Sequence, residues 1–156
     1  MGATIATLLN GASRELAKTS PTPNLDAEIL LAHLLEIPRT HLYARPEQRI
    51  AENKLRLFAL TVVARCKGRP VAHLTGQRDF WSLTLKVTPE TLIPRPETER
   101  LVEETLRYVP VDTRRYLLDL GTGSGAIALA LAKERPNCTI IATDISRAAL
   151  TVAYEN

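Results

Sequence analysis

Three glycines at alternate positions follow one acidic residue and precede another: Gly121, Gly123 and Gly125 lie between Asp119 and Asp144. Glycine allows a tight turn and lets a ligand approach the backbone closely. An acidic side chain at the end of a neighbouring strand can accept hydrogen bonds from both hydroxyls of a ribose. The types and spacing of these residues favour a site for a nucleoside-containing ligand over a merely structural turn.

Two cofactors compete for this pattern. Gly121, Gly123 and Ala126 satisfy the loose dinucleotide pattern G-x-G-x-x-G/A, and Asp144 lies near the expected spacing of about 20 residues, so NAD stays open. No lysine lies in the loop, which excludes a phosphate cradle of the G-x-x-x-x-G-K-[ST] type. Asp119 suits an ammonium group better than a pyrophosphate. This favours S-adenosylmethionine, which carries both an ammonium group and a ribose.

A strand, a turn, a helix and a second strand must position these residues. The apolar run at residues 116–118 has no helical stripe and predicts a buried strand. Residues 126–133 are rich in good helix formers and end before a proline. Residues 139–142 form a second apolar run. The loop between the first strand and the helix therefore faces unpaired helical N–H groups, which favour an anionic group.

The preceding residues divide into a helical part and a hairpin. Residues 1–75 carry helical apolar patterns separated by prolines, which predict a compact bundle. Residues 80–87 alternate apolar and polar side chains as in a half-buried strand, and residues 91–93 are expected to return as a second strand. We therefore expect a β-hairpin linker over residues 76–94 and a second domain over residues 95–156.

The composition is that of a globular protein, with 45% hydrophobic and 24% charged residues. No apolar stretch approaches the roughly 18 residues of a membrane span, and the N-terminus lacks a signal pattern, so we expect a cytoplasmic protein. Cys66 and Cys138 have no C-x-x-C partner, and the three histidines lack the spacing of metal ligands. No metal site is expected.

Positive charge is concentrated in the first half of the chain. Residues 1–78 hold 11 Lys and Arg against 6 Asp and Glu, whereas residues 79–156 hold 9 against 11. Seven basic residues fall between residues 45 and 69, mostly within the longest helical pattern, at about residues 46–67. They could face nucleic acid or an acidic protein, although a solvated helix face is the interpretation that we favour.

Four stretches of the sequence resemble the release factor glutamine N5-methyltransferases of the PrmC/HemK type. They are Leu74-Thr75-Gly76, Asp79-Phe80-Trp81, the segment T-L-I-P-R-P-E-T-E at residues 91–99 and the glycine loop at residues 119–125. The loop alone is typical of class I methyltransferases, whereas I-P-R-P-E-T-E after a hairpin is more specific. The resemblance covers essentially the whole chain. It implies an α+β chain with a helical bundle, a hairpin linker and the first βαβ portion of a Rossmann-like methyltransferase domain.

This resemblance also implies an activity and a set of site residues. The family uses S-adenosylmethionine to methylate the glutamine side-chain amide in the Gly-Gly-Gln motif of a peptide chain release factor, which the helical domain grips. By position, the cofactor would be bound by Asp119, Gly121, Thr122, Gly123, Ser124, Gly125 and Asp144. The active site would be bordered by Arg95, Glu97 and Thr98, which otherwise simply begin a helix.

One family motif is missing. The ten prolines include no adjacent pair, so the Asn-Pro-Pro-Tyr motif that orients the substrate amide is absent and no catalytic residue is assigned. We therefore expect an N-terminal fragment that is inactive alone. Two other functions stay open: an adenine-N6 nucleic-acid methyltransferase, which presents an exocyclic amine with a similar motif, and a non-catalytic module that binds release factor.

Overall fold

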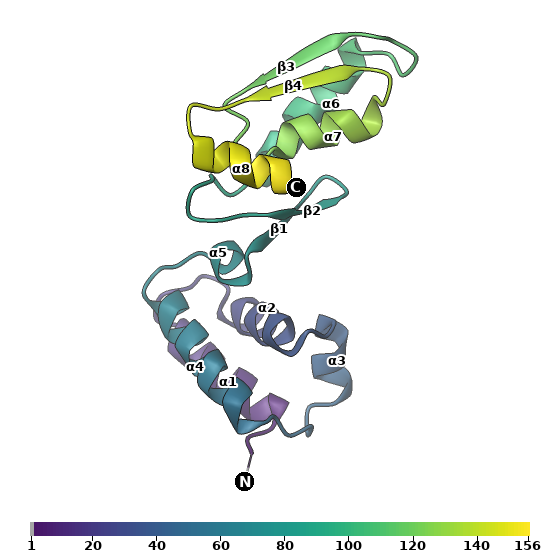
Figure 1. Cartoon of the computed structure of the whole chain (residues 1–156). Helices are drawn as coiled ribbons and strands as arrows, with labels where there is room; N and C mark the ends of the chain where they lie inside the picture. The colour runs from purple at the N-terminus through teal and green to yellow at the C-terminus, as the bar shows by residue number, and fades with distance from the viewer. Residues whose placement is uncertain (1) are drawn as a thin grey trace. The chain divides into compact units, whose positions relative to one another are not determined.

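The computed structural model describes residues 2–156, and the chain divides into two compact units, Met1–Thr75 and Gly76–Asn156 (Figure 1). Each unit has its own hydrophobic core. The expected α+β arrangement is confirmed, since helices make up the first unit and two small sheets with helices make up the second. Residues 76–94 belong to the second unit, because Phe80 and Leu85 are buried in its core.

The first unit is a helical bundle built around α1, α2 and α4, which contact one another pairwise. Its buried side chains include Ile5, Leu16, Leu30, Leu31 and Phe58. The helices are α1 (Ile5–Leu16), α2 (Pro23–Leu35), α3 (Arg39–Ala44), α4 (Glu52–Cys66) and α5 (Val71–Thr75).

Helix α4 begins six residues later than the sequence pattern predicts. Residues 46–50 instead lie along the start of α1, where the carbonyls of Pro46 and Gln48 accept hydrogen bonds from the N–H groups of Ala6 (2.9 Å) and Ile5 (3.0 Å). The first amides of a helix lack partners within the helix, and the carbonyls of this segment satisfy two of them in α1. The long-range pairing overrides the local helical pattern.

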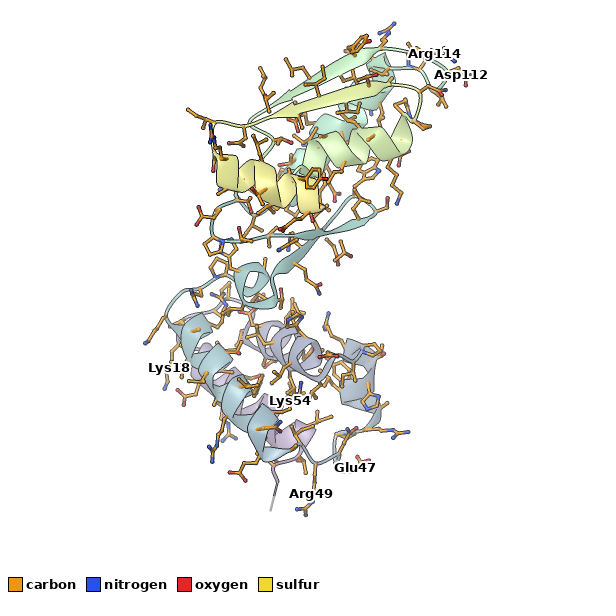
Figure 2. All side chains as sticks on the ribbon, viewed as in Figure 1. Lys18, Glu47, Arg49, Lys54, Asp112 and Arg114 are labelled. Atoms are coloured by element: carbon orange, nitrogen blue, oxygen red, sulfur yellow. The ribbon has the colours of Figure 1, made fainter. Side chains whose placement is uncertain are left out.

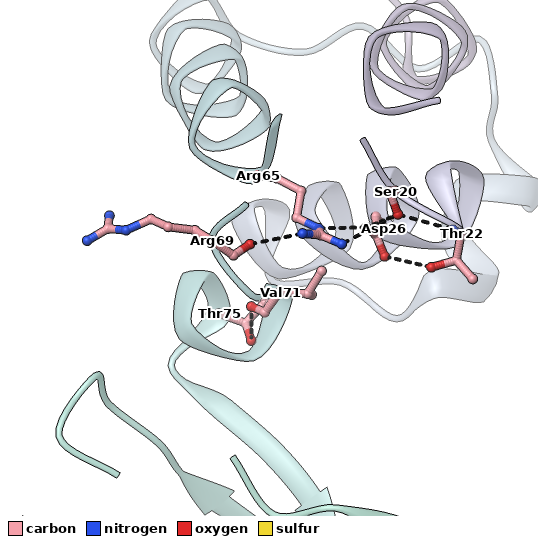
Figure 3. A network of polar contacts seen from close by, with 7 residues as sticks. All are labelled: Ser20, Thr22, Asp26, Arg65, Arg69, Val71 and Thr75. Carbon is pink, nitrogen blue, oxygen red and sulfur yellow. Dashed lines mark hydrogen bonds and ion pairs between the residues drawn. The ribbon is translucent and has the colours of Figure 1, made fainter. Parts of the chain in front are cut away.

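A buried polar network joins the start of α2 to the end of α4 (Figure 3). Asp26 is only 5% exposed and accepts hydrogen bonds from Ser20 Oγ (2.7 Å), Thr22 Oγ1 (3.1 Å) and Arg65 Nε (2.7 Å). Arg65 also donates to the carbonyl of Arg69 at 3.3 Å. A buried carboxylate is tolerated when it is paired and hydrogen-bonded, so this network fixes the two helices relative to each other.

The second unit begins with an antiparallel hairpin and continues into a parallel pair of strands with helices on one side (Figure 1). Its elements are β1 (Gln77–Phe80), β2 (Leu83–Lys86), the 3₁₀ helix η1 (Pro96–Thr98), α6 (Glu99–Tyr108), β3 (Tyr116–Leu120), α7 (Ala126–Glu134), β4 (Thr139–Thr143) and α8 (Arg147–Glu155).

The hairpin turns at Trp81 and Ser82, so the predicted strand over residues 80–87 is observed only over residues 83–86, as β2. The prediction that residues 91–93 form its partner is wrong, because β1 pairs with β2 instead. Trp81 has a φ of +56°, which a bulky residue rarely adopts. Two acceptors stabilise it: Glu99 Oε1 accepts from the Trp81 backbone N–H at 2.7 Å, and Glu134 Oε1 accepts from its indole N–H at 2.8 Å.

The parallel strands β3 and β4 pair in register, with Leu117 opposite Ile140. These two side chains pack against the core of the unit. Successive side chains of a strand point to opposite faces, and the other face is open in the described chain: Leu118 is 59% and Leu120 75% exposed. The predicted buried strand is therefore buried only on the face toward the helices, and no helix of residues 2–156 covers the other face.

Candidate functional site

The glycine loop connects β3 to α7 and has a backbone that only glycine adopts easily. Gly123 has a φ of +57°. Apart from its two chain neighbours, no heavy atom of residues 2–156 lies within 4 Å of a Cβ built there, so the backbone surface around it is open to a ligand. Gly125, the N-cap residue of α7, has a φ of +83°, and a Cβ there would lie 3.1 Å from Leu129 Cδ1 and 3.3 Å from Ala153 Cβ. Gly123 thus leaves space for a ligand. Gly125 is needed for packing, because Leu129 and Ala153 occupy the space beside it.

The ends of the two strands hold the loop in place. The backbone N–H groups of Gly121 and Thr122 both donate to the carbonyl of Thr143 at 2.9 Å. The Thr122 hydroxyl donates to Asp119 Oδ2 at 2.7 Å, and the Thr143 hydroxyl donates to the Asp119 carbonyl at 3.3 Å. The loop is therefore preorganised by hydrogen bonds to residues at the carboxyl ends of both strands.

Asp144 follows β4 and is hydrogen-bonded through both carboxylate oxygens. Oδ2 accepts from the Gly123 N–H and Oδ1 from the Ser146 N–H, each at 2.9 Å. The Ser146 amide first, and the Gly123 amide second, hold the pKa of the Asp144 carboxyl below its ordinary value. The carboxylate is ionised at neutral pH, and each oxygen retains a lone pair for another donor.

Asp119 lies at the end of β3 with one carboxylate oxygen free. Its Oδ2 accepts from Thr122, while Oδ1 has no hydrogen-bond donor among residues 2–156. At the other side of the loop, the Ser124 N–H has no acceptor in that same part of the chain, and the first amides of α7 point out of the helix end. The site thus presents a carboxylate oxygen and a group of N–H donors, as a zwitterionic ligand requires.

The expected border residues do not join this cluster. Arg95 and Glu97 are exposed and Thr98 is half-buried, and the Thr98 N–H donates to the Arg95 carbonyl at 3.0 Å as η1 begins. Within the described residues no hydrogen bond connects the three to the glycine loop. Their placement at the active site stays a prediction.

Two residues beside the loop were not identified from the sequence. Ile145 directly follows Asp144 and is fully exposed at 103% despite its apolar side chain. An apolar residue immediately after an acid at a strand end is a signal that could have identified it. Asn156, at the end of α8, contacts the Ser124 carbonyl at 2.8 Å through its side-chain amide. No local pattern identifies such a residue, because the contact spans 32 positions.

The basic residues of the first unit are partly engaged within the protein. Lys54 donates to the Leu34 carbonyl at 2.7 Å, and Arg65 pairs with Asp26. Arg56 lies 3.8 Å from Glu52 on the exposed face of α4. Arg49 and Lys54, both labelled in Figure 2, lie at the end of the unit where residues 46–50 meet α1. Of these contacts, the Arg65–Asp26 pair neutralises a basic side chain away from solvent, whereas the hydrogen bond from Lys54 to a carbonyl leaves its positive charge in place.

Other kinds of site find no support in the described part of the chain. Residues 2–156 contain no group of three or more His, Cys, Asp or Glu side chains that could hold a metal ion. Cys66 and Cys138 are both free thiols. None of the helices described combines the length and apolar character that crossing a membrane requires.

A helical unit is followed here by a parallel strand–glycine turn–helix–strand unit, which is the beginning of a Rossmann-like domain, a fold that methyltransferases share with dinucleotide-binding proteins. Residues 7–76 match the PrmC N-terminal domain family, and residues 99–156 match the methyltransferase small domain family. The chain therefore belongs to the release factor glutamine methyltransferase family. It corresponds to the N-terminal part of the proteins in that family.

Three curated relatives carry the name release factor glutamine methyltransferase. The protein from Coxiella burnetii is 51% identical over 144 residues, which cover 92% of this chain and 52% of the relative. The Escherichia coli K12 protein is 49% identical over 139 residues, covering 89% and 50%. The Vibrio cholerae protein is 45% identical over 158 residues, covering 100% and 54%. The chain spans about half the length of the curated relatives that it matches.

Proposed function

We propose that this chain forms part of an enzyme that transfers a methyl group from S-adenosylmethionine to the glutamine side-chain amide of a peptide chain release factor. The observation that supports the cofactor most directly is the pair of backbone amides, from Gly123 and Ser146, that hold the ionised Asp144 carboxylate beside the glycine loop. The relatives, similar along nearly the whole chain, support the substrate.

The residues present fit this cofactor, which supplies a methyl group activated by a sulfonium. Asp144 is suited to the ribose hydroxyls, and the free Oδ1 of Asp119 to the ammonium group. The Ser124 N–H and the N-terminal amides of α7 are suited to the carboxylate. The open backbone at Gly123 lets the ligand approach, and Ile145 offers an apolar surface beside the ribose-binding acid.

The acceptor chemistry depends on orientation more than on a strong base. An amide nitrogen is a poor nucleophile because its lone pair is delocalised, so the enzyme must align it with the methyl group. No residue of this chain is assigned that role, since the Asn-Pro-Pro-Tyr motif is absent. We propose that the helical unit contributes binding of the release factor and the second unit contributes binding of the cofactor.

Calorimetry with S-adenosylhomocysteine tests the cofactor proposal on the 156-residue chain. We expect saturable binding that Asp144→Ala weakens and that Asp112→Ala leaves unchanged, because Asp112 lies in the loop before β3 (Figure 2). A parallel titration with NADH should show no saturation. Binding of NADH without binding of S-adenosylhomocysteine would overturn the cofactor assignment.

A chimera tests methyl transfer. Residues 1–156 would be followed by the second half of the Escherichia coli relative, and the protein incubated with labelled S-adenosylmethionine and either release factor or adenine-containing DNA. We expect label on the glutamine of the release factor and none on DNA. The 156-residue chain should bind release factor without transferring label. Label on DNA alone would support the nucleic-acid alternative instead.

A further inference from the structure

The side-chain amide of Asn156 joins two segments of the second unit that lie far apart in sequence. Its Nδ2 donates to the carbonyls of Lys86 (3.0 Å) and Ser124 (2.8 Å), while its Oδ1 accepts from the Lys86 N–H at 2.6 Å. Both amide hydrogens and the amide oxygen are therefore used. The carboxylate of aspartate cannot reproduce this pattern, because it has no hydrogen to donate.

The contact matters for the glycine loop because Ser124 is buried. Ser124 is 2% exposed, and within residues 2–156 its carbonyl receives no hydrogen bond other than the one from Asn156. A buried carbonyl left without a donor is costly, so Asn156 fixes the orientation of the peptide group between Ser124 and Gly125. That peptide group adjoins the free N–H of Ser124 and leads directly into α7.

The segment from Asp144 to Asn156 holds three consecutive loop residues. Asp144 accepts from the Gly123 N–H, Asn156 donates to the Ser124 carbonyl, and Ala153 packs closely against Gly125. The end of α8 also lies next to β2 in Figure 1, where Glu155 pairs with the Lys86 ammonium group at 2.6 Å. Residues at the end of α8 therefore contact both the glycine loop and strand β2 of the hairpin.

We propose that Asn156 is a positioning residue for the cofactor loop and that it couples this loop to hairpin strand β2. This inference rests on the proposed function, since it concerns the orientation of N–H groups toward S-adenosylmethionine. Cofactor binding that orders the loop must then stabilise the hydrogen bond from the Lys86 N–H to Asn156 Oδ1. Because coupling between two sites is reciprocal, breaking that hydrogen bond must lower the cofactor affinity by the same factor.

Variants of Asn156 and a neighbouring control separate this role from general stability. Asn156→Ala removes all three bonds, and Asn156→Asp keeps an acceptor for the Lys86 N–H but places a carboxylate against two carbonyl oxygens. Asn156→Gln retains the amide one methylene further away. Glu155→Gln is the matched control, since it breaks the Lys86 ion pair at the same helix end without touching the loop.

Calorimetry and amide hydrogen exchange on the folded 156-residue chain provide the readouts. Asn156→Ala should weaken S-adenosylhomocysteine binding about tenfold, as expected for loss of the partly buried hydrogen bond to the Ser124 carbonyl. Asn156→Asp should weaken it at least as much while Lys86 stays protected from exchange, and Asn156→Gln should recover part of the loss. In the unsubstituted chain and in Glu155→Gln, the ligand should slow exchange at Lys86, and this effect should vanish in Asn156→Ala.

Wild-type affinity in folded Asn156→Ala would overturn the inference. If the unsubstituted chain binds no S-adenosylhomocysteine, the cofactor proposal fails for this chain, and the inference is decided on the free protein. Backbone resonances of Ser124 and Gly125 must then shift in both Asn156→Ala and Asn156→Asp but not in Glu155→Gln. Unshifted loop resonances would overturn it. Should Asn156→Ala fail to fold, the comparison of Asn156→Asp with Asn156→Gln decides in the same way.

Discussion

The backbone N–H of Gly123 donates to Asp144 Oδ2 at 2.9 Å, across 21 positions of the sequence. This bond joins the turn after β3 to the residue after β4, so the two parts of the candidate cofactor site are held as one structure. A second amide, from Ser146, binds the other oxygen of the same carboxylate. The acid is therefore oriented before any ligand arrives, which lowers the entropic cost of binding.

Acid should weaken this arrangement, and only below the ordinary pKa of an aspartate. The pKa of Asp144 is lowered in the folded chain, so its bonds contribute stability that is complete above the pKa of the unfolded chain and is lost as the pH falls through the folded pKa. We expect Asp144→Asn to reduce the difference in unfolding free energy between neutral pH and about pH 3. Urea unfolding at a series of pH values measures it. An unchanged pH dependence would show that Asp144 gains nothing from the two amides.

The strand–turn–helix–strand unit was predictable because its signals are local. The glycines, the apolar runs and the acids at the ends of the two strands all lie within residues 116–144, and the matching fold is observed there. The hairpin was misplaced because the positive φ of Trp81 depends on Glu99 and Glu134, which are 18 and 53 positions away. The start of α4 was misplaced because residues 46–50 pair with the start of α1.

The candidate site was predictable only in part. Residue types indicated Asp119 and Asp144, but the sequence gives no sign that one carboxylate is bound by two amides while the other keeps a free oxygen. Asn156 was not identified, because an amide at the end of a helix has no distinctive spacing. Contacts of this kind depend on the tertiary fold, and a single sequence does not display them.

Gly125 should tolerate no side chain. Gly125→Ala would place a methyl group 3.1 Å from Leu129 Cδ1 and 3.3 Å from Ala153 Cβ at a φ of +83°, so we expect a loss of about 1–3 kcal/mol in unfolding free energy. Gly11→Ala is the control, because Gly11 lies inside α1 and, apart from its chain neighbours and the nearby backbone of α1 itself, no atom of residues 2–156 lies within 4 Å of the added Cβ. It should stabilise the chain by about 0.5–1 kcal/mol. Equal effects of the two substitutions in urea unfolding would contradict the packing argument.

The buried network of the first unit should be far more sensitive than a surface ion pair. Asp26→Ala leaves the Arg65 guanidinium, whose side chain is 16% exposed, without its carboxylate. We expect a loss of about 3 kcal/mol in the unfolding free energy. Glu15→Gln removes the ion pair between Lys18 and Glu15, whose side chains are 71% and 64% exposed, respectively. This substitution should change the unfolding free energy by less than about 0.5 kcal/mol. Thermal unfolding of both variants measures the difference between the two losses of stability. Equal losses would show that solvent reaches Arg65 and that the network is not buried.

Gly123 should separate ligand affinity from stability. Its φ of +57° makes Gly123→Ala cost about 1 kcal/mol in stability, since alanine adopts this region with modest strain. Apart from its two chain neighbours, no atom of residues 2–156 lies within 4 Å of the added Cβ, so no packing penalty is expected in the free chain. The methyl group would project from backbone that we propose the cofactor approaches. Affinity for S-adenosylhomocysteine should therefore fall further than stability does, by about tenfold or more.

Gly11→Ala again serves as the control for Gly123→Ala, because it adds a methyl group remote in sequence from the loop and should leave affinity unchanged. Calorimetry gives the affinity, and urea unfolding of the same samples gives the stability. If Gly123→Ala loses stability but binds S-adenosylhomocysteine as tightly as the unsubstituted chain, the ligand does not approach the backbone at Gly123. The open surface there would then have no part in cofactor binding, and the glycine would serve only the turn.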